Sequence, residues 1–176
     1  STDVGPVIDE PSRKFLVDHA ARMDREAKKI NEAKLAPGSD NGTFFAPRAY
    51  EIPSLSLLTG EVFGPVLHVV RWKADDLDGV IDAINATGFG LTLGIHSRID
   101  DTIAHISRRA KVGNCYVNRN QIGAVVGVQP FGGEGLSGTG PKAGGPHYLL
   151  RFATERTVTI NTTAAGGNAS LLTLGE

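Results

Sequence analysis

The sequence has one cysteine, almost no net charge and no long apolar run. A single cysteine excludes an internal disulfide framework. Lys and Arg number 18 against 19 Asp and Glu, and this balance gives no electrostatic basis for binding nucleic acid or an anionic membrane. No apolar run approaches the roughly 20 residues needed to span a bilayer, and the polar N-terminal residues do not resemble a signal peptide. We therefore expect a cytoplasmic chain without nucleic-acid or membrane partners for this segment.

The histidines and the lone cysteine lack the context of a reactive or metal-binding site. His19 falls on the apolar stripe of a predicted helix, where a core or boundary role is expected. Cys115 lies in a β-rich apolar run and is expected to be a small buried hydrophobic residue without thiolate reactivity. No metal site is predicted, because the other histidines show no ligand spacing: His68, His96, His105 and His147.

Glycine is abundant in one place. Residues 123–147 hold nine glycines and a single aromatic residue, Phe131. A flexible linker would be polar, whereas this segment carries Val125, Val128 and Leu136, which favours an ordered loop that presents backbone N–H donors to a ligand. The GxGxxG pattern at 133–138 has neither a preceding strand nor a following helix, so a dinucleotide fingerprint is not predicted there.

Apolar periodicity predicts alternating helices and strands. Asp9 is expected to cap a helix that has Pro11 in its first turn and an apolar stripe reaching Ala27. A turn at 37–42 and an extended segment from Thr43 indicate a strand pair. Strands and helices then alternate over residues 66–72, 76–86, 91–96, 100–110 and 114–118. This order predicts an α/β fold with a parallel sheet covered by helices.

The last part of the chain follows a different pattern. Residues 145–155 are expected to form a short helix that begins at Pro146. Residues 156–161 alternate as a strand with one apolar face. From the residues alone, this strand is either an internal edge strand or one that adds to the sheet of another chain.

Residues 118–133 (NRNQIGAVVGVQPFGG) and 137–146 (SGTGPKAGGP) resemble the substrate-anchoring region of the aldehyde dehydrogenase superfamily. More narrowly, they are similar to the glutamate-semialdehyde (pyrroline-carboxylate) dehydrogenase branch and its bifunctional proline utilization A flavoproteins. The similarity covers nearly all of the chain and begins partway through the catalytic domain. It implies that residues 1–155 form the C-terminal part of that domain, with a substrate-anchor loop at 120–145. Residues 156–176 would form an oligomerisation strand and a C-terminal tail.

The resemblance also assigns binding roles to five residues. It places the N–H groups of Gly123 and Ala124 on the carboxylate of the semialdehyde, and Phe131 against its aliphatic chain. Glu61 matches the glutamate that hydrogen-bonds the nicotinamide ribose of NAD, and Phe63 matches the aromatic residue beside it. Without the resemblance, Glu61 and Phe63 would be only a solvated carboxylate and a packing anchor in a loop.

The activity implied is NAD-dependent oxidation of glutamate semialdehyde to glutamate in proline catabolism. The nucleophilic cysteine and the general-base glutamate of the family lie upstream of the position that matches Ser1, so no catalytic residue is assigned and the isolated chain is expected to be inactive. FAD would belong to a proline dehydrogenase domain outside this chain, and a homo-oligomer is expected. Two alternatives remain: a non-catalytic assembly module that uses the strand at 156–162, or a dehydrogenase of another aldehyde.

Overall fold

The computed structural model describes residues 4–125 and 127–161. The chain divides into two compact units. The first unit comprises Ser1–Phe89 and Ser97–Lys111, and the second comprises Gly90–His96 and Val112–Glu176. The α/β class predicted from the periodicity is confirmed, since helices and strands alternate through most of the chain.

The first helix, α1 (Glu10–Glu26), forms where the sequence predicts it. Asp9 caps it, because its carboxylate accepts a hydrogen bond of 2.8 Å from the backbone N–H of Ser12, and a proline occupies the first turn. The residues it buries share one stripe: Leu16, His19, Ala20 and Met23. Phe15, on the same helix, is 49% exposed.

A three-stranded sheet packs beside α1 in the order β1-β2-β3. Its strands are β1 (Lys28–Glu32), β2 (Arg48–Glu51) and β3 (Val66–Val69). β2 and β3 are parallel, whereas β1 and β2 are antiparallel. Met23 of α1 joins Tyr50 and Ile52 in a fully enclosed cluster, so the helix and the sheet share one hydrophobic core.

The strand pair around the turn at 37–42 exists, but its strands lie farther from the turn than expected. No strand begins at Thr43. Its backbone carbonyl instead accepts a hydrogen bond of 2.9 Å from the N–H of Val7, and the following Phe45 and Ala46 are buried. Burial of these side chains next to the N-terminal loop takes them out of the sheet. Two short 3₁₀ helices, at Ser39–Asn41 and Leu55–Leu57, complete the connections.

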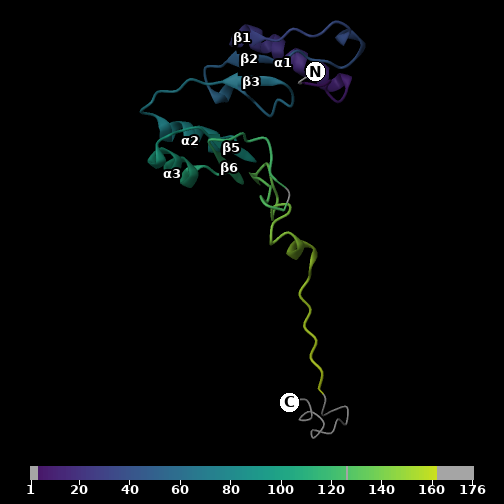
Figure 1. The fold of residues 1–176 in the computed structure, drawn as a ribbon, viewed down its shortest axis with the longest axis vertical. Helices are drawn as coiled ribbons and strands as arrows, with labels where there is room; N and C mark the ends of the chain where they lie inside the picture. The colour runs from purple at the N-terminus through teal and green to yellow at the C-terminus, as the bar shows by residue number, and fades with distance from the viewer. Residues whose placement is uncertain (1–3, 126, 162–176) are drawn as a thin grey trace. The chain divides into compact units, whose positions relative to one another are not determined.

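Two further helices of the first unit confirm their predictions. α2 (Leu77–Ala86) and α3 (Asp100–Arg109) lie side by side (Figure 1). Arg109 pairs with Asp78 and with Asp82, the latter at 2.7 Å. The side chain of Asn85 adds a second connection, because it donates to the carbonyl of Arg109 at 3.0 Å and accepts from the N–H of Lys111 at 2.8 Å.

The second unit is built on the parallel pair β5 (Thr92–Ile95) and β6 (Asn114–Val117), as predicted. Two very short strands, β4 (Phe89–Gly90) and β7 (Glu134–Gly135), pair with each other. The prediction that Cys115 is buried was wrong: Asn114 and Tyr116 are buried, and the side chain of Cys115 between them is exposed. Successive strand residues face opposite sides, so the sheet geometry decides which of them are covered.

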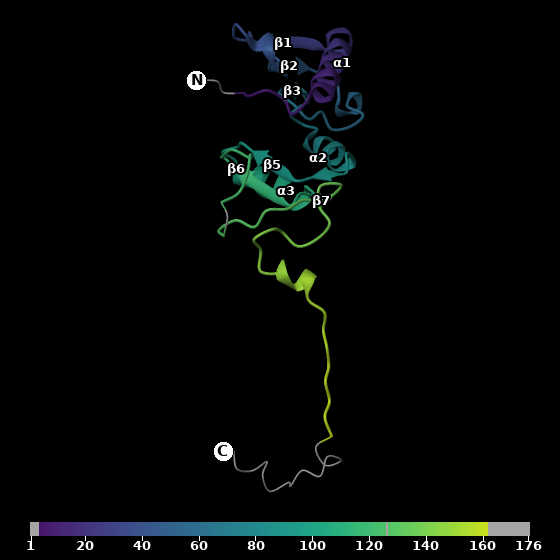
Figure 2. The same cartoon turned by 90° about the vertical axis from the view of Figure 1, so that its right-hand side faces the viewer.

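The C-terminal part is less regular than predicted. Residues 145–155 contain only a 3₁₀ helix, η3 (Leu149–Phe152), instead of a helix that begins at Pro146. Residues 156–161 are exposed and pair with no strand in the described part of the chain (Figure 2). The internal edge strand is therefore excluded within that part, while an intermolecular strand stays a prediction. The tail predicted for 162–176 lies outside the described residues.

Candidate functional site

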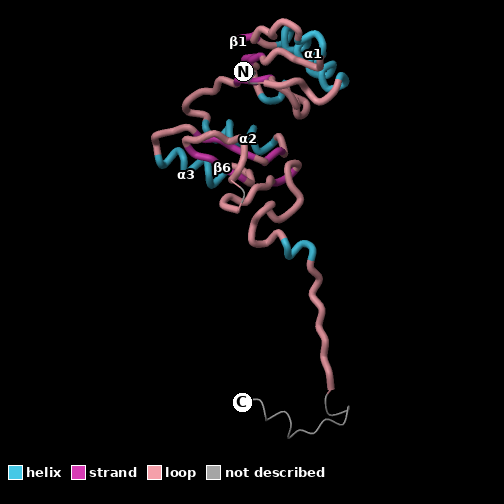
Figure 3. The backbone as a smooth tube through the Cα atoms, turned by 45° about the vertical axis from the view of Figure 1, so that its right-hand side comes forward, coloured by secondary structure: helices cyan, strands magenta, loops and turns pink. Residues whose placement is uncertain are grey.

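The glycine-rich segment starts where β6 ends. β5 and β6 run parallel and finish at the same edge, where the N–H of Asn118 donates to the carbonyl of Ile95 at 2.8 Å. Asn118 has a φ of 54°, a left-handed conformation that asparagine tolerates better than most residues, and it turns the chain out of the sheet. Figure 3 shows the segment after β6 as mostly loop. In α/β proteins, this carboxyl edge is where ligands bind.

Gly123 and Ala124 expose their backbone donors in this loop. Both residues are half-buried, and neither N–H donates a hydrogen bond to another residue among 4–125 and 127–161. A Cβ added to Gly123 would meet no atom within 4 Å, so the space beside this backbone is open. Consecutive backbone N–H groups without an acceptor in the described residues suit an anion such as a carboxylate.

Phe131 is held by its own backbone. Its N–H donates to the carbonyl of Ala143 at 3.0 Å, and its carbonyl accepts from the N–H of Ala143 at 2.9 Å, which forms an isolated antiparallel bridge. Its side chain is half-buried. The aromatic residue that the resemblance places against the substrate therefore has a fixed backbone.

Close backbone contacts require glycine at two points of this region. A Cβ on Gly113 would overlap the carbonyl oxygen of Gly132, and a Cβ on Gly138 would overlap the carbonyl oxygen of Gly133. These are backbone neighbours, which cannot move aside as a flexible side chain can. The glycine content thus serves close packing of the chain on itself, as well as donor exposure.

Charged side chains on loops are usually solvated, and Lys142 departs from this rule. Glu134 is indeed exposed, but Lys142 is half-buried. Its ammonium donates to the carbonyl of Gly113 and lies 3.4 Å from Oδ1 of Asn114. Sequence reasoning missed both Asn114 and Lys142, because they are 28 positions apart and no local pattern connects them.

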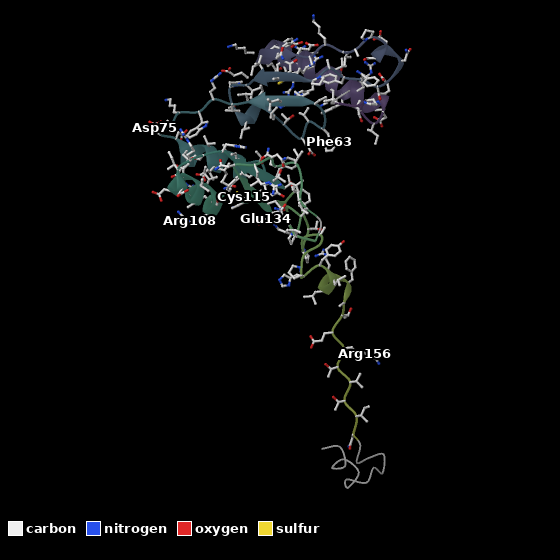
Figure 4. All side chains as sticks on the ribbon, in the orientation of Figure 1. Phe63, Asp75, Arg108, Cys115, Glu134 and Arg156 are labelled. Carbon is white, nitrogen blue, oxygen red and sulfur yellow. The ribbon has the colours of Figure 1, made fainter. Side chains whose placement is uncertain are left out.

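Glu61 and Phe63 lie in the first unit, in the loop before β3. Val62 between them packs against the cluster of Leu16, Ala20 and Phe45. Both flanking side chains are exposed, and Phe63 is 82% exposed (Figure 4). The interpretation of Phe63 as a packing anchor is therefore wrong for the described residues, and both side chains are accessible to a ligand.

The chemistry of this pair fits a nicotinamide ribose. A carboxylate offers two acceptor oxygens to the two neighbouring hydroxyl groups, and an exposed aromatic ring can pack on the sugar or the nicotinamide. Gly64 positions the loop against α1, since a Cβ there would lie 2.5 Å from Cδ1 of Leu16. The structure thus places Glu61 with Phe63 in one unit, and Gly123, Ala124 and Phe131 in the other.

Two histidines, the buried His19 and the half-buried His68, form a pair that the sequence did not reveal. Nε2 of His19 on α1 lies 2.9 Å from Nε2 of His68 on β3. Burial lowers the pKa of His19, and the nearby charges of His68 and Arg22 lower it further. Burial, followed by the charge of Arg22, lowers the pKa of His68 as well. This pair favours the neutral imidazoles and is a structural feature of the first unit.

Other features of the described residues do not add a second site. A groove of about 850 Å³ in the first unit is lined by residues of α1 and β1 and by the segment around Phe45, and neither Glu61 nor Phe63 lines it. No group of three or more His, Cys, Asp or Glu residues suited to a metal ion occurs in the parts searched, 4–125 and 127–161. None of the helices described there is long and apolar enough to cross a membrane.

Comparison with known proteins identifies the family. The model described as "Aldehyde dehydrogenase family" matches residues 1–158. The chain belongs to this family. It is 56% identical over 158 residues to the bifunctional protein PutA of Rhizobium meliloti, and the match covers 90% of this chain and 13% of that protein. The resemblance stated from the glycine-rich segment is thereby confirmed.

Solved structures agree with this assignment. A mutant of Bradyrhizobium japonicum proline utilization A (PutA) is 62% identical, with a TM-score of 0.85 over 93% of this chain and 16% of the other. A Thermus 1-pyrroline-5-carboxylate dehydrogenase with bound NAD is 37% identical, with a TM-score of 0.76 over 85% of this chain and 29% of the other. The chain thus spans less than a third of the length of each of these relatives.

Proposed function

We propose that this chain supplies the substrate anchor and part of the NAD contact of a dehydrogenase that oxidises glutamate semialdehyde to glutamate. The observation that carries this proposal is the pair of open N–H donors at Gly123 and Ala124, at the carboxyl edge of β6 in a member of the aldehyde dehydrogenase family. The chain would act together with the further segments that its relatives contain. The names of PutA and 1-pyrroline-5-carboxylate dehydrogenase support the substrate class.

The substrate carboxylate would accept hydrogen bonds from both N–H groups. Backbone donors hold an anion at any pH at which the substrate is ionised, since they do not titrate. Phe131 would cover the aliphatic part of the substrate, and its double hydrogen bond to Ala143 keeps that surface in place. The carboxylate anchor and the apolar wall together would select aldehydes that carry an acid group at the far end.

Glu61 and Phe63 would bind the nicotinamide riboside of NAD. Glu61 would accept from the ribose hydroxyls, while Phe63 would pack beside the ring. NAD, when bound, supplies the hydride acceptor. No nucleophilic role is proposed for Cys115 in β6. FAD would belong to a proline dehydrogenase domain outside it, and the intact protein would be cytoplasmic.

Replacing Gly123 by valine in the intact dehydrogenase tests the anchor. The new side chain would occupy the open space beside the N–H groups, and KM for glutamate semialdehyde should rise about 10-fold to 100-fold, the cost of losing a hydrogen bond to a charged group. KM for a neutral aldehyde should change little. Gly60→Val is the matched control, because a Cβ at Gly60 also meets nothing within 4 Å. Equal losses for neutral and carboxylate-bearing aldehydes would contradict the anchor.

Two further measurements separate this proposal from its alternatives. The isolated 176-residue chain should produce no NADH from the semialdehyde. Turnover of the substrate by the purified chain would contradict the proposal that this chain supplies binding contacts but not the nucleophile. An aldehyde without a carboxylate that proved a better substrate would favour a dehydrogenase of different specificity.

An assembly role for residues 156–161 is a second proposal, and it accompanies the first. Val158 and Ile160 are 64% and 75% exposed, and residues 156–160 belong to no strand in the described part of the chain. Such an edge suits addition to the sheet of a second copy. Thr159→Pro removes one N–H and should weaken the oligomer in analytical ultracentrifugation. An unchanged mass would reject the intermolecular strand.

A further inference from the structure

We propose that Asn114, braced by Lys142, is a positioning residue that sets the place of Phe131 in the substrate site. This inference rests on the proposed function, because it assumes that Phe131 contacts the substrate. It adds two residues that the resemblance did not assign. Both belong to the second unit, as does Phe131.

The side-chain amide of Asn114 imitates a neighbouring strand. Its Nδ2 donates to the carbonyl of Pro130 at 3.0 Å, and its Oδ1 accepts from the N–H of Gly132 at 3.1 Å. These are the residues on either side of Phe131. The backbone groups of Phe131 itself point the other way and pair with Ala143.

Residues 130–132 are therefore fixed from both edges. In a strand, successive residues direct their N–H and C=O groups to opposite sides. Ala143 satisfies one side and the amide of Asn114 satisfies the other, so the segment behaves as the middle of a three-membered ladder. This arrangement sets both the direction of the Phe131 side chain and its position relative to Asn114 and Ala143.

Lys142 holds Asn114 in the required orientation. Its ammonium lies 3.4 Å from the same Oδ1 that accepts from Gly132, and it also donates to the carbonyl of Gly113, the residue before Asn114. An ammonium has donors but no acceptor, so it favours the rotamer that directs the amide oxygen toward it. The other end of the amide is then aimed at Pro130.

Because Asn114 is buried, loss of its hydrogen bonds would be costly. Asn114 is 9% exposed, so loss of its amide would leave the carbonyl of Pro130 and the N–H of Gly132 short of partners. The close approach of Gly113 to Gly132 keeps the two backbones at the distance that the asparagine spans. A shift of Phe131 by about 1 Å is enough to cost up to 100-fold in an oriented reaction.

Steady-state kinetics of the intact dehydrogenase test this role. Asn114→Ala should raise KM for glutamate semialdehyde about 10-fold with a smaller change in kcat, while acetaldehyde, which has no chain to lie on Phe131, should be affected little. Asn114→Asp retains Oδ1 and should recover part of the loss. Lys142→Met keeps the apolar stem of the side chain and should raise KM by a smaller factor of about threefold. If Asn114→Ala does not fold, this variant provides the test.

Asn85→Ala is the matched control. Asn85 is half-buried and, like Asn114, bridges two backbone groups, the carbonyl of Arg109 and the N–H of Lys111. Its loss should lower Tm to a similar extent but leave KM unchanged. A rise in KM equal to that of Asn114→Ala would show that general destabilisation explains both, and would overturn the inference.

Phe131→Ala separates the inference from the function on which it rests. If Phe131→Ala raises KM and Asn114→Ala does not, Asn114 has no positioning role, although the proposed function stands. If Phe131→Ala itself leaves KM unchanged, the proposed apolar wall is wrong and the inference fails with it. A shared rise in KM for both variants supports both.

Discussion

The region around α1 and the glycine-rich region are stabilised in different ways. Around α1, large side chains are removed from water: Leu16, Met23 and Tyr50 have no measurable exposure. In the glycine-rich region, few side chains are buried, and the chain is held by backbone hydrogen bonds and by glycine contacts such as that between Gly113 and Gly132. The first arrangement builds a packed hydrophobic core, and the second leaves the N–H groups of Gly123 and Ala124 without an acceptor in the described residues.

The comparison also explains where polar side chains matter. In the first region, the buried His19 makes its polar contact with another side chain, that of His68 at 2.9 Å. In the second, the amide of Asn114 replaces a strand neighbour, so one polar side chain determines the local backbone. Hydrogen–deuterium exchange of the intact protein can follow both regions separately, since each yields its own peptides.

The largest effect is expected from Leu16→Ala. Removal of this fully buried side chain leaves a cavity beside Ala20 and Phe45 and should lower the free energy of unfolding by about 4 kcal/mol. Exchange should rise in α1 and β2. Leu67→Ala, at a position 61% exposed, is the control and should change little. Equal exchange in both variants would show that burial of α1 does not stabilise this region.

Gly113→Ala should have the next largest effect. Its methyl group would overlap the carbonyl of Gly132, and we expect a loss of about 3 kcal/mol, typical of overpacking. Exchange should increase in peptides that cover 130–143 and not in α1. A protein of unchanged stability and unchanged KM would refute the claim that close backbone contact holds this region. Gly60→Ala, which has open space, provides the comparison.

Tyr50→Phe should have a smaller effect. The hydroxyl donates to the carboxylate of Asp24 at 2.9 Å, and its loss should cost about 1 kcal/mol while the ring stays packed. Thermal unfolding is the measurement, with Tyr148→Phe as the more exposed control, 39% exposed. A loss as large as that of Leu16→Ala would mean that polar contacts dominate the core.

The smallest effect at neutral pH concerns His19 and His68. Their pKa values are lowered in the folded state, so below the ordinary histidine value of about 6.5 the unfolded chain binds more protons. The contribution of the two neutral histidines to the free energy of unfolding should be fully present above that pH and should be lost as the pH drops below it. His19→Leu should flatten this fall in stability in a series of thermal melts at different pH values. If the variant His19→Leu loses as much stability at low pH as the unchanged protein, other titrating groups cause the loss.

The helices and strands were predictable where apolar residues recur along the sequence with the period of a helix or of a strand. The apolar stripe of α1, the helices α2 and α3, and the parallel pair β5–β6 all follow from periodicity, and the aldehyde dehydrogenase resemblance followed from the glycine-rich segment. The strand after the turn begins at Arg48 and not at the start of the extended segment at Thr43, and the burial expected for Cys115 was wrong. Both depend on which face another element covers, and local sequence does not specify that.

The sequence by itself determined the fold class, the family and the candidate residues Glu61, Phe63, Gly123, Ala124 and Phe131. Their types and order are enough, because periodicity and motif are properties of the chain. Only the tertiary structure joined His19 to His68, and Asn114 with Lys142 to the backbone around Phe131. Contacts between residues this far apart arise from the folding of the backbone, which brings together side chains that no spacing in the sequence relates.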